Sequence, residues 1–320
     1  MVVLGGVTRL TGSGLSMVQW EPIMGILPPL SQAEWQETFR LYQQFPEYKI
    51  KNYGMSLDEF KAIFWFEYSH RVLGRSIGMI FFFPMLYFFL RGKVEKTLKP
   101  KLIAMFILGG LQGLMGWYMV KSGLVANPHV SQYRLTAHLA LAFIVYAYIF
   151  WVAMDLLLPQ ENNSSIKDKE SLKKRSLLLT SFIFITVLSG GFVAGLKAGM
   201  AYNTFPLMNG QLIPDGLLSL TPLWSNFFEN VTTVQFDHRV LATLLFISIP
   251  AFWFSIMKKN PPARLKLGLN LLLGMLAIQI TLGISTLLLH VPVALAAAHQ
   301  AGALILFTIM LFVAQQIRKL

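Results

Sequence analysis

The sequence of 320 residues contains no cysteine. This absence excludes disulfides, iron–sulfur clusters and thiolate metal sites, and it leaves imidazole as the strong nitrogen ligand available to a metal. Charged residues are also scarce, at 13 % of the chain, whereas 55 % of the residues are hydrophobic. A soluble domain of this length cannot bury so much apolar surface, so the composition predicts an integral membrane protein.

Acidic residues number only 15 against 27 lysines and arginines, which gives a net charge of +12. On a soluble domain such a charge would indicate nucleic acid. Here the cations lie in short loops between apolar runs, so membrane topology explains them and we expect no nucleic-acid partner. The start of the chain lacks the pattern of a cleavable signal or transit peptide, because Met1 leads through an apolar run directly to Arg9.

Seven apolar runs reach the roughly 20 residues that a helix needs to cross a bilayer. They predict helices at about 62–90, 101–120, 134–158, 176–196, 233–257, 266–290 and 295–317. Residues 1–8 have the character of an eighth span but are too short to cross alone, so we expect the first helix to be truncated. The sequence therefore predicts an all-α protein with eight transmembrane helices in contact with the lipid bilayer.

The loops between these runs differ in their content of lysine and arginine. Those at 91–101 and 159–175 carry five each and that at 258–266 carries four, whereas the intervening loops carry one or none. The positive-inside rule places the basic loops and both termini in the cytoplasm. We expect the inner membrane of a bacterium, with the mitochondrial inner membrane as the alternative.

Two stretches share the word His-Arg-Val-Leu, at His70 and at His238. Gln112 matches Gln279 and His138 matches His299 at similar offsets, which indicates an internal repeat of about 160–170 residues. The first helices match more loosely, Gly5-Gly6-Val7 against Gly190-Gly191-Phe192. Each copy holds an even number of helices, so the copies are parallel repeats. We predict an N-terminal four-helix half at 1–158 with an outer loop at 10–61, a cytoplasmic linker at 159–175, and a C-terminal four-helix half at 176–320.

The four matched histidines fall at one depth near the outer leaflet, two in each half. A helical bundle supplies two axial imidazoles to one heme in this way, so we expect His70, His138, His238 and His299 to be iron ligands. A single histidine in a membrane is more often a packing residue, but four at repeated positions favour ligation. The neighbouring Arg71 and Arg239 suit heme propionates or lipid headgroups.

Glu67 lies three residues before His70 and therefore on the same helical face, whereas the matching position holds Gln235. A carboxylate can accept a proton or stabilise positive charge, so this asymmetry predicts one chemically active heme pocket and one electron-transfer pocket. Pairing of Glu67 with Arg71, four residues on, is an equal alternative.

The outer loops carry their own helix signals. Ser31 with Glu34 and Ser56 with Glu59 are capping boxes, and they predict helix starts at both places. The helix that follows Ser31 has an aromatic face and is expected to lie on the membrane surface. We expect the loop at 10–61 to cover the His70 site and the loop at 197–232 to cover the other half.

Several long sequence motifs resemble the heme A synthase family, in particular its cysteine-free alphaproteobacterial and mitochondrial branch. They are Gly-Gly-Val-Thr-Arg-Leu-Thr-Gly-Ser-Gly-Leu-Ser at 5–16, Glu-Tyr-Ser-His-Arg at 67–71, and the stretches 112–124, 132–139, 190–199 and 203–208. The resemblance covers nearly the whole chain. It implies eight helices in two four-helix halves and an oxidoreductase that makes heme A for cytochrome oxidase.

The resemblance also implies roles for individual residues. His238 and His299 would hold a permanent heme b, while His70 and His138 would hold the substrate heme O, with Glu67 in the catalytic role. The family oxidises the C8 methyl through an alcohol to a formyl group, taking the oxygen from water. Heme O synthase and an electron acceptor are the expected partners, and a homo-oligomer is among the expected assemblies.

Two other functions fit part of the pattern. A di-heme b-type cytochrome that relays electrons would hold two permanent hemes and would have no use for the Glu67/Gln235 asymmetry. A transporter built from parallel repeats would use the histidines as proton-coupled sites and would bind no heme.

Overall fold

A computed structural model describes residues 1–18, 27–123, 130–158 and 168–320. Within these ranges the regular structure is helical, apart from one isolated β-bridge between Met208 and Gln211. Seven of the helices are long and apolar enough to cross a membrane, which confirms the predicted all-α, multi-pass membrane protein. The chain forms two compact units, 1–134 and 135–320, and each is described by itself. Residues 159–167 of the linker predicted at 159–175 lie outside the described residues, and residues 169–175 are not linker but the start of a helix, Lys169–Gly195.

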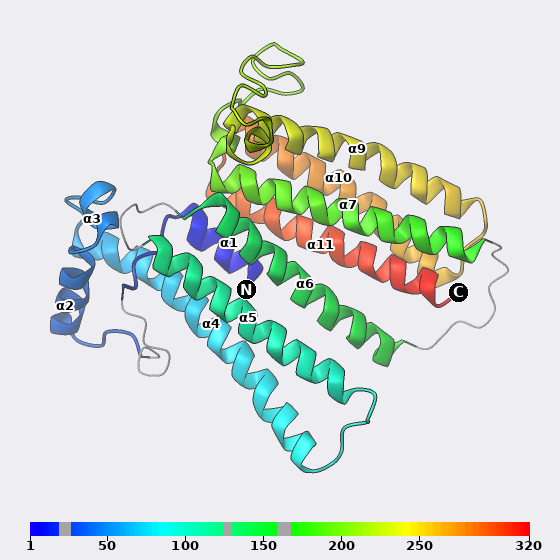
Figure 1. Ribbon diagram of the computed structural model, residues 1–320, viewed down its shortest axis with the longest axis horizontal. Helices are drawn as coiled ribbons and strands as arrows, with labels where there is room; N and C mark the ends of the chain where they lie inside the picture. The colour runs from blue at the N-terminus through cyan, green and yellow to red at the C-terminus, as the bar shows by residue number, and fades with distance from the viewer. Residues whose placement is uncertain (19–26, 124–129, 159–167) are drawn as a thin grey trace. The chain divides into compact units, whose positions relative to one another are not determined.

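The first unit contains five complete helices (Figure 1). They are α1 (Val2–Leu10), α2 (Gln32–Tyr42), α3 (Pro46–Ile50), α4 (Leu57–Leu90) and α5 (Lys99–Gly123). Helix α4 begins earlier than its apolar run because the capping box at Ser56 starts it: the Ser56 hydroxyl accepts from the Glu59 backbone N–H at 3.3 Å, and the Glu59 carboxylate accepts from the Ser56 N–H at 2.8 Å. The second predicted box, at Ser31, starts α2.

Helix α2 buries its aromatic face against the outer part of α4. Trp35 and Tyr42 join Phe60 and Phe64 in an aromatic cluster, with the rings of Trp35 and Phe64 edge-to-face at 5.0 Å between centroids. The face that we expected on the membrane surface is therefore covered by protein. Because each such ring removes a large apolar area from water, this cluster anchors α2 to the start of α4.

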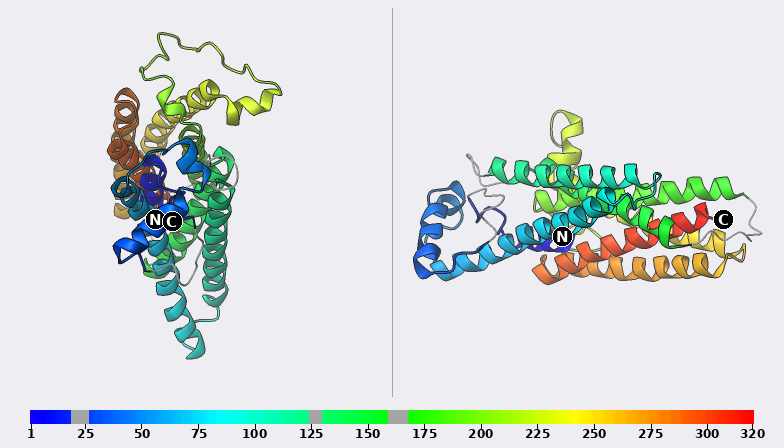
Figure 2. Two further views of the ribbon diagram at one scale, coloured as in Figure 1. Left: turned by 90° about the vertical axis from the view of Figure 1, so that its left-hand side faces the viewer. Right: turned by 90° about the horizontal axis from the view of Figure 1, so that it is seen from below.

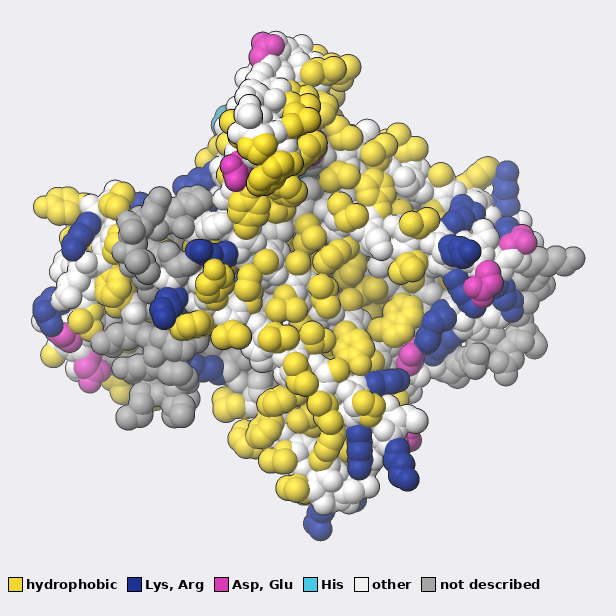
Figure 3. Space-filling model, in the orientation of Figure 1, with side chains coloured by type: hydrophobic (Ala, Val, Ile, Leu, Met, Phe, Trp, Pro, Cys, Tyr) yellow, Lys and Arg dark blue, Asp and Glu magenta, His cyan; other side chains and the backbone are white. Residues whose placement is uncertain are grey.

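The second unit contains a bundle of four long helices, α7 (Lys169–Gly195), α9 (Val231–Met257), α10 (Ala263–Leu288) and α11 (Val293–Arg318). Each packs against two others in the cyclic order α7, α9, α10, α11, and α10 and α11 run side by side in both views of Figure 2. The one-turn helix α8 (Asn226–Glu229) precedes α9. Lysines and arginines gather where α7 begins and α9 and α11 end (Figure 3), as the positive-inside rule predicts for one side of a membrane.

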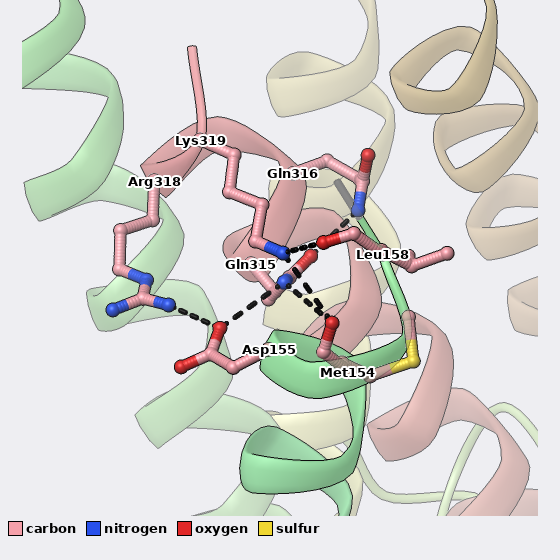
Figure 4. Close-up of polar contacts among 7 residues, drawn as sticks. All are labelled: Met154, Asp155, Leu158, Gln315, Gln316, Arg318 and Lys319. Carbon is pink, nitrogen blue, oxygen red and sulfur yellow. Dashed lines mark hydrogen bonds and ion pairs between the residues drawn. The ribbon is translucent and has the colours of Figure 1, made fainter. Parts of the chain in front are cut away.

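Helix α6 (Gln132–Leu157) packs along α11. Phe143 contacts Phe307 with 5.3 Å between ring centroids, and the Tyr146 hydroxyl lies 2.7 Å from that of Thr308. Polar groups close the C-terminal ends of the two helices (Figure 4), where Arg318 pairs with Asp155. In the same group the Gln315 amide donates to Asp155 and to the Met154 carbonyl at 3.3 Å, and Lys319 donates to the Leu158 carbonyl.

One carboxyl beside the aromatic cluster makes the first unit sensitive to pH. Glu47 is 4 % exposed, and burial raises its pKa from the ordinary 4.5 to about 7, against a smaller lowering by Lys51. A folded-state pKa above the unfolded value stabilises the fold at low pH, and this stabilisation is lost as the pH rises from 4.5 through about 7. Its neighbour Tyr42 shares the burial, which raises the phenol pKa.

We therefore expect Glu47→Gln to slow amide hydrogen exchange in residues 32–50 relative to wild type at pH 8, and to change it little at pH 5. The amide keeps the packing but carries no charge that burial can penalise. Glu37→Gln, on the exposed face of α2, is the control and should give no such gain, because Arg40 lowers the pKa of Glu37. Equal exchange in wild type and Glu47→Gln at both pH values would contradict the prediction.

Candidate functional site

His238, near the start of α9, is held by the helix beside it. Its Nδ1 lies 2.7 Å from the hydroxyl of Ser189 on α7, and that hydroxyl donates its own proton to the Thr186 carbonyl at 2.7 Å. A serine hydroxyl has one proton to give, so it can only accept from Nδ1–H. In the neutral ring this arrangement places the lone pair on Nε2, which is the form in which histidine binds a metal.

His299, on α11, is held in a similar way by α10. The Gln279 side-chain nitrogen lies 3.2 Å from Nδ1 of His299 and donates to the His299 carbonyl at 3.0 Å. An amide nitrogen only donates, so in this contact Nδ1 of His299 accepts and the ring proton lies on Nε2, the opposite of His238. Turning the Gln279 amide over would bring its oxygen, which has no hydrogen-bond partner in the described part of the chain, to Nδ1 and would free Nε2. Both histidine side chains are half-buried.

Glycines allow these rings to pack closely against neighbouring helices. A Cβ on Gly190 of α7 would lie 3.2 Å from Cε1 of His238, and one on Gly283 of α10 would lie 2.9 Å from Cε1 of His299. In the first unit, a Cβ on Gly5 of α1 would lie 3.1 Å from Nε2 of His70. Gly5 and Gly190 are matched in the predicted sequence repeat. In both places, therefore, a glycine of the first helix packs against the histidine on the second helix of the same copy.

His70 and His138 belong to different compact units. His70 lies on α4 beside Gly5, and His138 lies on α6 in the second unit; both are half-buried. Close to His138, Thr136 packs on Gly191, whose Cβ would lie 2.9 Å from the threonine hydroxyl. That His70 and His138 ligate one iron stays a prediction.

Glu67 is buried, and both of its carboxylate oxygens are occupied. One oxygen accepts from the Ser16 hydroxyl at 2.7 Å and from the Met17 backbone N–H at 2.8 Å, and the other pairs with Arg71. Arg71 in turn donates to the Met17 carbonyl at 2.9 Å. The alternative in which Glu67 pairs with Arg71 is therefore present. We name Ser16, Met17, Glu67 and Arg71 the N-terminal clamp.

The second unit has a matching C-terminal clamp, made of Gln235 and Arg239 on α9 and the main chain at Tyr202 and Thr204. The Gln235 amide donates to the Tyr202 carbonyl at 3.0 Å. Arg239 donates to the same carbonyl at 2.8 Å and to that of Thr204 at 2.9 Å. In each copy, a pair of residues four apart on the second helix thus holds the segment that follows the first helix.

Sequence reasoning identified the histidines, Glu67 and both arginines but missed Ser16, Met17 and Ser189. Two signals pointed to them. Ser16 ends the long word at 5–16, and Ser189 directly precedes the Gly190 pair that matches Gly5 and Gly6. What no sequence pattern shows is which main-chain groups of a loop fold back onto a helix.

The donor set fits the iron of a heme better than a bare ion. Among the described residues no group of three or more histidine, cysteine, aspartate or glutamate side chains could hold a metal ion. A porphyrin supplies four nitrogens of its own and requires only axial ligands, and His238 presents the Nε2 lone pair that such a ligand needs. Fold and donor set together define a multi-pass helical membrane protein with paired imidazoles on facing helices.

The chain belongs to the cytochrome oxidase assembly protein family, whose sequence profile matches residues 1–311. It is 59 % identical to the heme A synthase of Nitrosospira multiformis, over 100 % of this chain and 90 % of that protein. It is 55 % identical to the heme A synthase of Nitrosomonas eutropha, over 99 % and 89 %. Identity to the human heme A synthase COX15 is 45 %, over 99 % of this chain and 79 % of the human protein.

The contact between Gly283 and His299 is open to a direct test. We expect Gly283→Ala to lower the midpoint of thermal unfolding in detergent, by the equivalent of about 1–3 kcal/mol, because the added methyl overpacks against the imidazole. Gly274→Ala is the matched control on the same helix, since a Cβ there meets no atom within 4 Å. A midpoint that falls equally in both variants would show that the ring does not depend on the glycine.

Proposed function

We propose that this protein converts heme O to heme A for cytochrome oxidase, by oxidising the C8 methyl of the porphyrin to a formyl group with oxygen from water. Relatives that carry the name heme A synthase are up to 59 % identical over the whole chain. The observation in the structure that supports this most directly is the contact of Ser189 with Nδ1 of His238, which leaves Nε2 of that ring for an iron.

We assign a resident heme b to His238 and His299. When bound, such a heme would accept and pass on single electrons. Ser189 orients His238 with its Nε2 lone pair free. His299 can bind iron through Nε2 once the Gln279 amide turns over, so that its oxygen accepts from Nδ1–H. Arg239 binds loop carbonyls through both terminal nitrogens, while its buried Nε has no hydrogen-bond partner among the described residues. That Nε–H is the group that we assign to a propionate.

The N-terminal half then receives the substrate heme, with His70 and His138 as ligands by analogy with the repeat and with Arg71 next to His70 in the sequence. Glu67 faces the same side of α4 as His70. Both of its oxygens already accept hydrogen bonds or pair with Arg71, so its role in our proposal is to supply negative charge that stabilises positive charge at the ring edge. A proton released in the reaction goes to an acceptor other than Glu67.

The wider setting follows from the same proposal. In this proposal the chain is a parallel repeat of four-helix halves, 1–158 and 176–320, in which α1 is the first of eight helices and both termini are cytoplasmic. The linker predicted at 159–175 is shorter, since α7 begins at Lys169. Relatives occur in bacteria and in mitochondria, and we place this chain in a bacterial inner membrane. Heme O synthase would deliver the substrate, and a separate acceptor would remove the electrons.

Extraction of bound hemes distinguishes the two halves. In cells that also make heme O, the purified protein should yield heme b together with heme O or A on chromatography. We expect His70→Ala to lose heme O and A and keep heme b, and His238→Ala to lose heme b, because each removes one axial ligand of one site. Elution of both variants as a single folded species in size-exclusion chromatography is the control.

Heme b alone, in both sites, would instead favour an electron relay. Absence of any heme would remove the argument from the histidines and favour a transporter.

A further inference from the structure

We propose that the N-terminal clamp holds residues 11–18 against α4 reversibly, so that this segment can open and close. In this proposal Ser16 and Arg71 are positioning residues for the reaction at His70. The clamp itself rests on contacts within the first unit. Only its purpose, to hold the segment beside a substrate that must enter and leave, rests on the proposed function. Two observations support the proposal. The N-terminal clamp lies next to His70, and it differs from the C-terminal clamp in its contacts and its charge.

The clamp and Gly5 bracket His70 along the chain. Gly5, inside α1, touches the imidazole, and the segment after α1 returns to α4 at Ser16 and Met17, where it meets Glu67 one turn before His70. Between these points the segment is compact: Ser13 is fully buried and its N–H donates to the Thr8 carbonyl at 2.9 Å. A change at the clamp therefore alters the cover on the same face of α4 that carries the histidine.

The two clamps differ in how firmly they hold. In the C-terminal clamp Asn203, between the two gripped carbonyls, also donates to the Leu287 carbonyl of α10 at 2.8 Å, so that segment is tied to two helices. In the described part of the chain, the polar contacts of Ser16 and Met17 with other elements are all with α4. A single change on α4 can thus free Ser16 and Met17 from that helix, whereas after a change on α9 Asn203 would still bind α10.

The charges of the two clamps also favour opening of the N-terminal segment. The N-terminal clamp is a buried ion pair, whereas the C-terminal position uses a neutral amide. A buried ion pair is weak support for stability, since its desolvation offsets much of its attraction, and well-packed neutral groups often serve as well. The half that exchanges its heme uses an ion pair, whereas the other half uses an amide and an arginine that both donate to main-chain carbonyls. This difference suits a segment that is released in one half only.

The absence of cysteine allows a direct measurement on the full-length protein. Leu15→Cys places a single thiol in the gripped segment, where the side chain is 4 % exposed. Ala198→Cys places a matched thiol, 0 % exposed in the native protein, after α7 in the C-terminal half. The rate of maleimide labelling of each thiol then reports how often its segment opens, whether or not heme is bound.

We expect Glu67→Gln to speed labelling at Leu15→Cys at least about tenfold, because it removes a hydrogen bond to a charged group and the ion pair together. Labelling at Ala198→Cys should stay within about twofold. Ser16→Ala should speed labelling at Leu15→Cys by a smaller factor and raise KM for heme O more than it lowers kcat. Arg71→Lys, which keeps the charge, should restore most of the slow labelling that Arg71→Gln loses.

Unchanged labelling at Leu15→Cys in Glu67→Gln, with activity lost, would overturn the proposal and leave Glu67 with a purely chemical role. Equal acceleration at both thiols would also overturn it, since the effect would then be global loosening. Accelerated labelling at Leu15→Cys alone, in a protein that binds no heme O or A, would leave the clamp standing and reject the proposed function instead.

Discussion

Polar groups within apolar helices must find partners, and this requirement sets the path of both outer segments. Leaving a charged or hydrogen-bonding group unpaired in apolar surroundings costs several kcal/mol, of order 2–3 for a side chain at the centre of a membrane helix. In the first unit the buried Glu67 obtains its partners from Ser16 and Met17. In the second, Gln235 and Arg239 obtain theirs from Tyr202. The conformation of each segment thus depends on two side chains of the helix that carries the histidine.

Close helix approach supplies the second requirement, the orientation of the imidazoles. Gly190 and Gly191 are adjacent on α7 and face different neighbours: Gly190 meets His238 on α9, and Gly191 meets Thr136 on α6. Any side chain at Gly191 would meet the threonine hydroxyl at 2.9 Å, so α7 can lie between two helices only because both positions are glycine. Ser189, the preceding residue, then reaches Nδ1 of His238. Three consecutive residues therefore fix one imidazole and one helix contact.

Much of this arrangement could be predicted from the sequence. Apolar runs gave the seven spans, the capping boxes gave the starts of α2 and α4, and the repeated words gave the histidines with their neighbours Gly190 and Gln279. The early start of α4 at Leu57 was underestimated because an apolar run marks the bilayer and not the helix. Ser16 and Met17 were missed because hydrogen bonds from a loop leave no periodic pattern. The packing of α6 on α11 depends on pairs such as Asp155 with Arg318, which are remote in sequence.

The repeat is also less symmetric than its shared sequence motifs suggest. The two halves differ in which main-chain groups bind the side chains at the matching positions Glu67 and Gln235. Glu67 accepts the N–H of Met17, whereas Gln235 donates to the carbonyl of Tyr202, so the two segments present opposite polarity to matching positions. A carboxylate at Gln235 would face a carbonyl oxygen, and an amide at Glu67 would turn its nitrogen toward either Arg71 or the two donors of the segment. Neither residue can replace the other without moving a loop. The chemical difference between the halves is therefore built into backbone conformation, and one substitution cannot convert one half into the other.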